Sequence, residues 1–304
     1  MQPVCVVMPA HNEQNHIEDS IASIQNIVDW IIVVDDGSND RTGELARKAL
    51  GDCGQVIRTE GLGVGGAIAI GSQAVLKLDD RNWITVIMAG DGQMDPVDLP
   101  AVIEPILAGR ADHVKGNRFI HPLGPRGMPF IRRLGTWWLS RLTSLACGRK
   151  LRDTQCGYTA TSRAMNEAWD WSETWSGYGY PNWWLMEASR RDFRIEEVPV
   201  RSVYGNEKSG IRLLPFFLSV SLMLWKGIWR RGFDWYIFGS KSPIGLRIIA
   251  SGLWFGAWSS LILAFNWPVL SLATITSFLL LMRLDQNESK RRTLMRWPTS
   301  KLVL

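Results

Sequence analysis

Cysteine and histidine are scarce in this chain, which has 304 residues and only four of each. None of the cysteines forms a C-x-x-C pair, so the sequence predicts no zinc site, no dithiol redox centre and no disulfide framework. The N-terminus has no basic segment before a long apolar run, and it predicts a strand in place of a signal peptide. Internal repeats and low-complexity linkers are absent as well. These absences indicate a globular protein whose N-terminal part is expected to stay in the cytosol.

Neither positive nor negative side chains are in large excess, because the formal net charge is only +5. Lysine and arginine gather at residues 226–247 and 283–301, without the basic–aromatic pattern of a nucleic-acid-binding module. We therefore expect a membrane surface or an anionic substrate as partner, and no nucleic acid. Tryptophan, in contrast, is plentiful: the 16 tryptophans crowd the second half, which suits a membrane interface or, equally, a tryptophan-rich core.

Residues 248–282 contain no charged side chain. One membrane-spanning helix needs about 20 such residues, and Asn266, Trp267 and Pro268 interrupt the run with turn chemistry. The sequence predicts a transmembrane helical hairpin over 243–284, interfacial amphipathic helices over 211–242 and a basic tail over 285–304. Basic residues on both flanks place both termini on the cytosolic side of an integral membrane protein. A buried helical pair and a re-entrant hairpin remain alternatives.

The first 210 residues alternate apolar, β-branched runs with helix-like stretches. This pattern predicts an α/β domain with a mostly parallel, Rossmann-like sheet and helices on both faces. Ligands of such sheets bind at the carboxyl ends of the strands, and these ends carry PAHNE, DDGSND and GDGQMD. One such cluster alone would be a solvated turn with helix caps, but three on one edge favour a nucleoside diphosphate with Mg²⁺ or Mn²⁺.

A glycine pattern, Gly61, Gly63 and Gly66, has the G-x-G-x-x-G spacing of a dinucleotide site. A dinucleotide fold carries this pattern after its first strand, whereas here it follows the acid-ended strand IIVVDD, so a nicotinamide enzyme is disfavoured. The glycines are expected to let backbone approach a nucleotide sugar, or to let a helix lie close to the sheet.

In their order along the chain, several motifs resemble the family-two glycosyltransferases that act on polyprenyl phosphates, such as dolichyl-phosphate mannose and glucose synthases. The motifs are VVMPAHNE, IIVVDDGSNDRT, GLGVGGAI, MAGDGQMDP, KGNRF, DTQCGYTATSR and IEEVPVRSVYGNEKSGI, and the resemblance covers roughly residues 3–215. It implies a cytosolic GT-A domain over 1–210 and an inverting hexosyl transfer. A nucleotide diphosphate sugar of the GDP-mannose or UDP-glucose type would give its sugar to a polyprenyl or dolichyl monophosphate. Another lipid or glycan acceptor, or a non-catalytic binding protein, is the alternative.

The resemblance also implies roles for single residues. The nucleotide sugar would be held by Pro9, His11, Glu13, Asp35, Asp36, Gly66, Asp91 and Lys208, and the metal by Asp91 and Gln93. The acceptor phosphate would be bound by Arg118, Arg132 and Arg133, of which Arg133 is favoured over Arg132. Asp153 would orient an arginine or shape the acceptor pocket, and it completes a catalytic set with Asp91, Arg118 and Arg133. Snorkelling toward lipid headgroups is the structural alternative for Arg132 and Arg133, and helix capping is the alternative for Asp153.

One departure from the family pattern concerns the metal. The D-x-D motif of the family would put an acid at position 89, where this chain has Ala89. One metal carboxylate is therefore missing, and the diphosphate would have to supply more of the ligands. Asp95 is a candidate substitute, although it is expected instead to begin a helix with Pro96.

Overall fold

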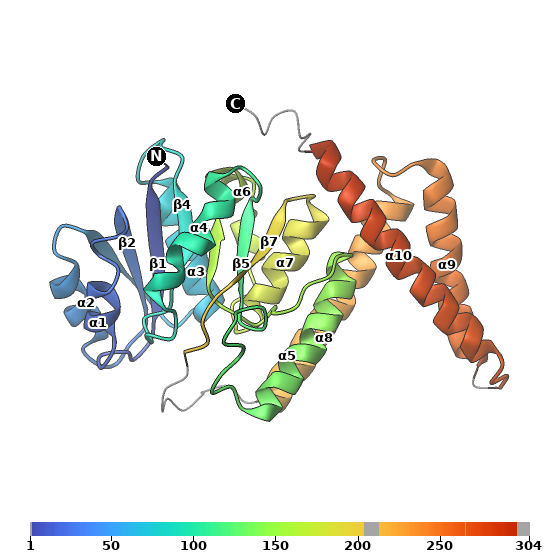
Figure 1. The fold of residues 1–304 in the computed structure, drawn as a ribbon, viewed down its shortest axis with the longest axis horizontal. Coiled ribbons are helices and arrows are strands. Elements are labelled where there is room, and N and C mark those ends of the chain that lie inside the picture. Colours follow the sequence, from blue (N-terminus) through green and yellow to red (C-terminus); the bar gives the residue numbers. More distant parts are fainter. Residues whose placement is uncertain (1, 204–212, 265, 297–304) are drawn as a thin grey trace.

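The computed structural model describes residues 2–203, 213–264 and 266–296. Its centre is a seven-stranded sheet in the order β3-β2-β1-β4-β6-β5-β7 (Figure 1). Strands β1 to β4 are parallel to one another, β6 is antiparallel to both β4 and β5, and β7 is parallel to β5. The predicted mostly parallel sheet is therefore confirmed.

The strands are β1 (Val4–Ala10), β2 (Trp30–Asp36), β3 (Gly54–Thr59), β4 (Ile84–Ile87), β5 (His113–Asn117), β6 (Thr159–Thr161) and β7 (Ile195–Pro199). The helices of the sheet domain are α1 (Ile17–Ala22), α2 (Thr42–Leu50), α3 (Val64–Leu76), α4 (Leu99–Leu107), α5 (Phe130–Cys147), α6 (Arg163–Glu167) and α7 (Tyr180–Arg190). Two short 3-10 turns are η1 (Pro96–Asp98) and η2 (Trp171–Glu173). The C-terminal helices are α8 (Leu213–Gly232), the π-helical turn η3 (Phe233–Ile237), α9 (Ile244–Leu263) and α10 (Leu270–Arg296).

Helices cover both faces of the sheet because successive side chains of its strands point to opposite sides. In β1, Val6 and Met8 join the core under α1, α2 and α4, whereas Cys5 and Val7 join the core under α3, α6 and α7. A continuous apolar run is thus needed to bury the strand on both sides, which explains why β1 and β2 contain almost no polar residue before their carboxyl ends.

Helices α5, α7 and α8 form a further layer beside the sheet. Helix α8 runs parallel to α5, and one side of it is buried in their shared core, through Val220, Met223 and Leu224. Its other side exposes Leu214, Leu218 and Leu222. Helix α8 is therefore apolar on both sides, and within the described part of the chain only one side is covered by protein.

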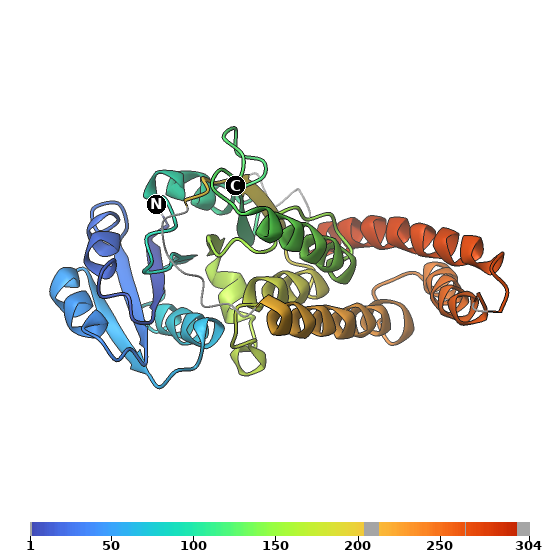
Figure 2. The ribbon, with the colours of Figure 1, turned by 90° about the horizontal axis from the view of Figure 1, so that it is seen from below.

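Helices α9 and α10 form an antiparallel hairpin that projects away from the sheet (Figures 1 and 2). Among the described helices, only α9 is long and apolar enough by itself to cross a membrane. The predicted boundary at residue 284 is not a break, because α10 continues as one helix to Arg296. Its last three turns bury Asp285, Glu288 and Arg292, so residues 285–296 form part of a packed helix and not a free basic tail.

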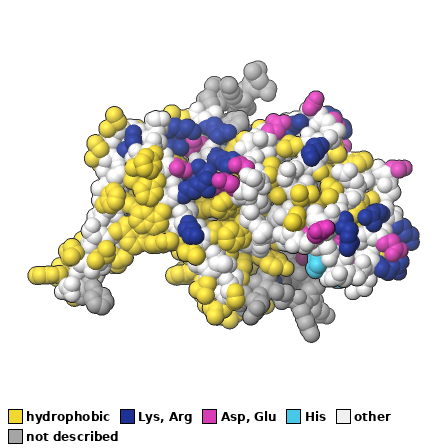
Figure 3. Space-filling model, turned by 180° about the vertical axis from the view of Figure 1, so that it is seen from behind, with side chains coloured by type: hydrophobic (Ala, Val, Ile, Leu, Met, Phe, Trp, Pro, Cys, Tyr) yellow, Lys and Arg dark blue, Asp and Glu magenta, His cyan; other side chains and the backbone are white. Residues whose placement is uncertain are grey.

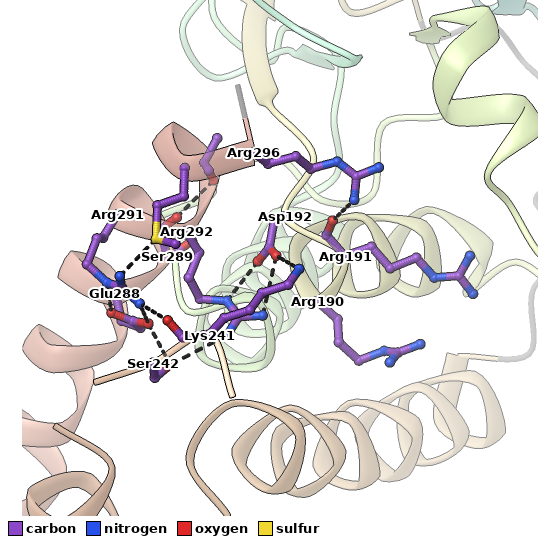
Figure 4. Close-up of polar contacts among 12 residues, drawn as sticks. Arg190, Arg191, Asp192, Lys241, Ser242, Glu288, Ser289, Arg291, Arg292 and Arg296 are labelled. Atoms are coloured by element: carbon purple, nitrogen blue, oxygen red, sulfur yellow. Dashed lines mark hydrogen bonds and ion pairs between the residues drawn. The ribbon is translucent and has the colours of Figure 1, made fainter. Parts of the chain in front are cut away.

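This last part of α10 is held to the sheet domain and to α8 by ion pairs on buried carboxylates, which we call the latch; Figure 4 shows the part of it around Asp192. Asp192, directly after α7, accepts hydrogen bonds of 2.8 Å from Arg292 Nε and from Lys241 Nζ. Asp285 accepts 2.6 Å bonds from Arg231 Nη2 and from the hydroxyl of Tyr236. A buried charge is tolerated only when opposite charges and donors surround it, and the latch meets that requirement.

We predict that Asp192→Asn lowers the free energy of unfolding by about 3–5 kcal/mol, because it leaves Arg292 buried without its counter-ion. Asparagine suits the left-handed backbone at this position, where φ is 65°. Denaturant unfolding in detergent micelles measures the change.

The control is Glu173→Gln, which removes an ion pair with Arg230 between half-exposed side chains. It should cost less than about 1 kcal/mol. Equal effects of the two substitutions would contradict the structural role of the latch.

Candidate functional site

The carboxyl ends of β1 and β2 are joined to each other by hydrogen bonds between their loops. The Ser38 hydroxyl accepts a 2.9 Å bond from Asn12 N, and Asn12 Oδ1 accepts one of the same length from Asn39 N. His11 Nδ1 lies 2.8 Å from the backbone oxygen of Asp36, while Glu13 N donates to the Thr42 hydroxyl. His11, Glu13 and Asp36, which are predicted to bind the nucleotide sugar, therefore lie together at the carboxyl edge of the sheet, close to Pro9 of β1.

Asp36 holds the glycine-rich loop. Its carboxylate accepts 2.7 Å bonds from the backbone N–H groups of Leu62 and Gly63 and a 2.6 Å bond from the Thr59 hydroxyl. Gly61 and Gly63 have φ values of 79° and 80°, a left-handed conformation that favours glycine. The glycine pattern is thus a loop that two backbone amides tie to an aspartate, which explains the pattern without a dinucleotide.

A second reason for these glycines is the segment before α7. Gly65 N donates a 2.7 Å bond to Ser176 O, and a Cβ on Gly65 would lie 1.9 Å from Trp175 O. Gly66, predicted to contact the donor, begins α3 beside Leu62, whose Cβ would lie 2.6 Å from a Cβ at this position. Close contact of the 175–177 segment with the start of α3 is a feature that the sequence did not reveal.

Asp35 points to the face of the sheet opposite to that of Asp36, toward Arg58 and the loop after β2. Its side chain is fully buried, and it accepts a 2.6 Å bond from Arg58 and a 3.0 Å bond from Ser38 N. Adjacent residues of a strand face opposite sides, so the two aspartates cannot play the same part. The structure gives Asp35 a role in holding β2, β3 and the loop after β2 together.

Asp91 and Gln93 lie in the turn after β4, where Asp91 Oδ1 accepts a 3.0 Å bond from Gln93 N. Among the described residues, no group of three or more histidine, cysteine, aspartate or glutamate side chains forms a ready metal site. One carboxylate and one amide nevertheless suit Mg²⁺ or Mn²⁺, since such ions commonly take their remaining ligands from substrate phosphates and water.

Ala89, the departure from the D-x-D pattern, lines an open cleft of about 330 Å³ together with Gly92 and Asp95. Asp95 is engaged elsewhere: it caps η1 through Val97 N and pairs with Arg201 at 2.8 Å. The expectation that Asp95 begins a helix with Pro96 is therefore confirmed, and Asp95 does not replace the missing ligand. The cleft leaves room for a larger side chain at position 89.

Arg118 and Asp153 form the central pair of the candidate acceptor side. Asp153 is fully buried and accepts three bonds from Arg118, of 3.0 Å from N, 2.8 Å from Nε and 2.9 Å from Nη2. Burial would raise the pKa of Asp153, but the charge and hydrogen bonds of Arg118 outweigh it and hold the pKa below its usual range. The predicted role of Asp153, to orient an arginine, agrees with this geometry.

Two charged groups next to this pair, the half-buried Glu197 and the buried Lys115, were missed by the sequence reasoning. Glu197 of β7 accepts bonds from the backbone N–H groups of Arg152 and Asp153 and from Asn117 Nδ2. Lys115 of β5 donates from Nζ to the backbone oxygen of Cys156, and burial lowers its pKa to about 8. A charged residue inside an apolar strand, as in KGNRF and IEEVPV, is the signal that would have identified both.

Helix α5 is tied to the same loop. The Ser140 hydroxyl lies 3.2 Å from both Thr154 Oγ1 and Thr154 N, and Asn182 Nδ2 donates to Thr143 and Thr154. These bonds fix the helix whose first turn carries Arg132, which is half-buried, and Arg133, which is exposed. Lys208 lies outside the described residues and stays a prediction.

Comparisons with known proteins cover most of the sheet domain that carries these residues. A family model described as Glycosyl transferase family 2 matches residues 5–172. A dolichyl-phosphate hexose transferase of Haloferax volcanii is 32% identical over 216 residues, 70% of this chain and 87% of that protein. A UDP-N-acetylglucosamine–dolichyl-phosphate N-acetylglucosaminyltransferase of Methanococcus voltae is 29% identical over 217 residues, 66% of this chain and 86% of that protein.

A solved structure also shares the fold. Glucosyl-3-phosphoglycerate synthase from Mycobacterium tuberculosis, in complex with Mn²⁺, uridine diphosphate and phosphoglyceric acid, has a TM-score of 0.56. It is 23% identical to this chain, and the match covers 76% of this chain and 78% of that one. This likeness confirms the GT-A-like α/β fold.

The buried Lys115 makes stability depend on pH. Between about pH 8 and 10.5 the folded protein has released a proton that the unfolded chain still holds. Lys115 should therefore make a contribution to the free energy of unfolding that rises with pH in this window, by at most about 1.4 kcal/mol per pH unit. Lys115→Met should lose this rise, whereas Lys77→Met, at an exposed position, should keep it. Denaturant titrations at pH 7.5, 9 and 10 test this, and parallel curves for wild type and Lys115→Met would contradict it.

Proposed function

Since the chain belongs to glycosyl transferase family 2, we propose that it transfers a hexosyl group from a nucleotide diphosphate sugar to a polyprenyl monophosphate at the cytosolic membrane surface. The two relatives described above are both named for dolichyl phosphate. The single observation that carries the proposal is the Arg118–Asp153 pair, because it fixes an arginine in a loop tied to α5, a helix whose first turns expose apolar side chains. A phosphate attached to a hydrocarbon chain requires that combination.

The donor binds at the edge formed by the loops after β1, β2 and β4. His11, Glu13 and Asp36 face the base and ribose. The ends of β1 and β2 already hold these residues in place before the nucleotide sugar binds. Asp35 acts on the donor only indirectly, by fixing the loop that follows Asp36. Asp91 and Gln93 lie on the same edge, beside the diphosphate.

The acceptor phosphate binds between Arg118 and the first turn of α5. Arg133 supplies an exposed positive charge there, and the N-terminus of α5 adds the partial positive charge of its unpaired N–H groups. The planar guanidinium group of arginine matches two phosphate oxygens at once. The polyprenyl chain continues along Phe130, Ile131 and Leu134, which are exposed on the same helix.

The chemistry asks little of the protein beyond positioning and charge stabilisation. An oxygen of the acceptor phosphate, already an anion, attacks the anomeric carbon from the side opposite the leaving diphosphate, so the configuration inverts and no general base is needed. Mg²⁺ or Mn²⁺, when bound at Asp91 and Gln93, supplies charge neutralisation for the departing diphosphate. Arg118 holds the acceptor phosphate still during the attack.

We predict that Arg118→Lys lowers kcat/KM for a short polyprenyl phosphate about 100-fold or more, since lysine cannot reproduce the fork that Asp153 orients. The KM for the donor should change less than about threefold. Steady-state assays of purified protein in detergent, with GDP- and UDP-sugars and mass spectrometry of the glycolipid, measure both parameters. Arg110→Lys, at a half-exposed ion pair with Glu104, is the matched control and should leave both unchanged.

Other results would point to the alternatives. Donor turnover with a different lipid or glycan, and none with polyprenyl phosphates, would move the proposal to another acceptor. Donor binding without turnover on any acceptor would indicate a non-catalytic binding protein. An Arg118→Lys effect confined to donor KM would contradict the acceptor role of this residue.

We predict that Ala89→Asp lowers the Mn²⁺ concentration for half-maximal activity about tenfold, because it adds a second carboxylate beside Asp91 in a cleft with room for it. Ala89→Asn, equal in size but neutral, is the control. Activity at graded Mn²⁺ after treatment with a chelator provides the measurement. Identical Mn²⁺ requirements of the two variants would show that the diphosphate alone determines metal affinity.

A further inference from the structure

We infer that the α9–α10 hairpin enters one leaflet of the bilayer and returns to the same side without crossing. The inference rests on the proposed membrane function, and it replaces the transmembrane hairpin expected from the sequence. Three features carry it: the length of the second arm, the contact between α8 and the hairpin, and the chemistry of the hairpin tip.

The second arm is too short to cross a bilayer. The latch fixes α10 at Asp285, whose carboxylate is bound by Arg231 and Tyr236, so the helix cannot slide further into lipid. Between the turn and Arg283, the uncharged part of α10 runs from Leu270 to Met282, about 20 Å at about 1.5 Å per residue. The hydrocarbon core is about 30 Å thick.

Helix α8 accompanies the hairpin over part of its length. The rings of Trp225 and Trp258 meet edge to face at 5.0 Å, and those of Trp229 and Trp254 at 4.8 Å. The order of these pairs shows that α8 and α9 are antiparallel. The start of α8 and the end of α9 therefore point in the same direction, toward the lower edge of Figure 1.

This arrangement sets a limit on insertion depth. Beyond the Trp225–Trp258 contact, α9 continues to Leu263, about 8 Å, whereas α8 extends back to Leu213, about 18 Å. A hairpin that crossed the bilayer would take the start of α8 through it as well. The adjacent start of α5, with Arg132 and Arg133, would enter the hydrocarbon too, and each arginine at the bilayer centre costs about 2.5–3.5 kcal/mol or more.

The tip of the hairpin is apolar where a crossing hairpin would meet water. Trp267 and Val269 are 69% and 86% exposed, and no charged residue occurs between 248 and 282. The ends of α5 and α8 are similar, with Phe130 78% and Leu214 70% exposed. Figure 3 shows hydrophobic side chains over both projecting ends, and lysine and arginine side chains higher on the same face.

One leaflet accommodates all of these features. Both projecting ends dip into the hydrocarbon, and the exposed Arg283, about 20 Å along α10 from Leu270, reaches the headgroup phosphates. The acceptor arginines then lie at the depth of the lipid phosphate itself. The hairpin thus sets the height of the active site above the membrane.

The test uses single nitroxide labels on the full-length protein in phosphatidylcholine–phosphatidylglycerol vesicles. Cysteine replaces Trp267, Leu272 or Leu279, one at a time, in a Cys53→Ser background, because Cys53 is exposed and the other three cysteines are buried. A label at Lys77→Cys, on the exposed end of α3, is the aqueous control. Collision rates with oxygen and with a water-soluble nickel complex report the depth of each label.

A re-entrant hairpin predicts that depth increases steadily from position 279 through 272 to 267. A maximum at 272, with position 267 accessible to the nickel complex, would overturn the inference and establish a crossing hairpin. Labels buried against a second copy would show spin–spin broadening and low access to both reagents, which would also overturn it. Failure of the proposed function is distinguishable: all labels would then behave like the control, and the labelled proteins would make no glycolipid.

Discussion

Burying a carboxylate is costly unless donors surround it, and this constraint decides how the parts of the protein are joined. Asp36 fixes the glycine-rich loop after β3, Asp153 fixes Arg118, and Asp192 fixes the last turns of α10. Each carboxylate lies where segments distant in the sequence meet. Because each one accepts hydrogen bonds from the segment opposite, displacement of that segment would leave a buried charge unpaired. The donor edge, the acceptor pair and the hairpin are therefore held at defined positions.

The sheet was predictable because its physical cause is local. Continuous apolar runs in β1, β2 and β4 are required when both faces of a strand are buried, and turn residues mark their ends. The three-residue β6 was not predictable, since so short a strand between β4 and β5 leaves no periodic signal. The extension of α10 to Arg296 was missed for a related reason: charges that follow an apolar run read as a tail until their partners are known.

The candidate site, too, contains residues that could be predicted from the sequence and residues that could not. The resemblance singled out Asp91, Arg118 and Asp153, and the structure places all three in loops at the carboxyl edge of the sheet, because motif order follows strand order. It could not distinguish Asp35 from Asp36, although the alternation of a strand sends one toward Arg58 and the other toward the glycine-rich loop on the opposite face. Glu197 escaped because its hydrogen bonds to Arg152 and Asp153 span more than 40 residues of sequence. Only the folded chain brings that carboxylate beneath the acceptor loop.

The latch has a consequence for how the protein divides into parts. Trp235 is completely buried, with the guanidinium groups of Arg231 and Arg292 each 4.7 Å from its ring. Removal of the chain from residue 243 onward would take away Asp285 and Arg292, and would leave Arg231 and Asp192 facing solvent without their principal partners. The apolar hairpin looks like a separate membrane anchor, but its base is packed into the catalytic half of the protein. Catalytic half and hairpin form one cooperative unit, and evolution or engineering can exchange the tip of the hairpin more easily than its base.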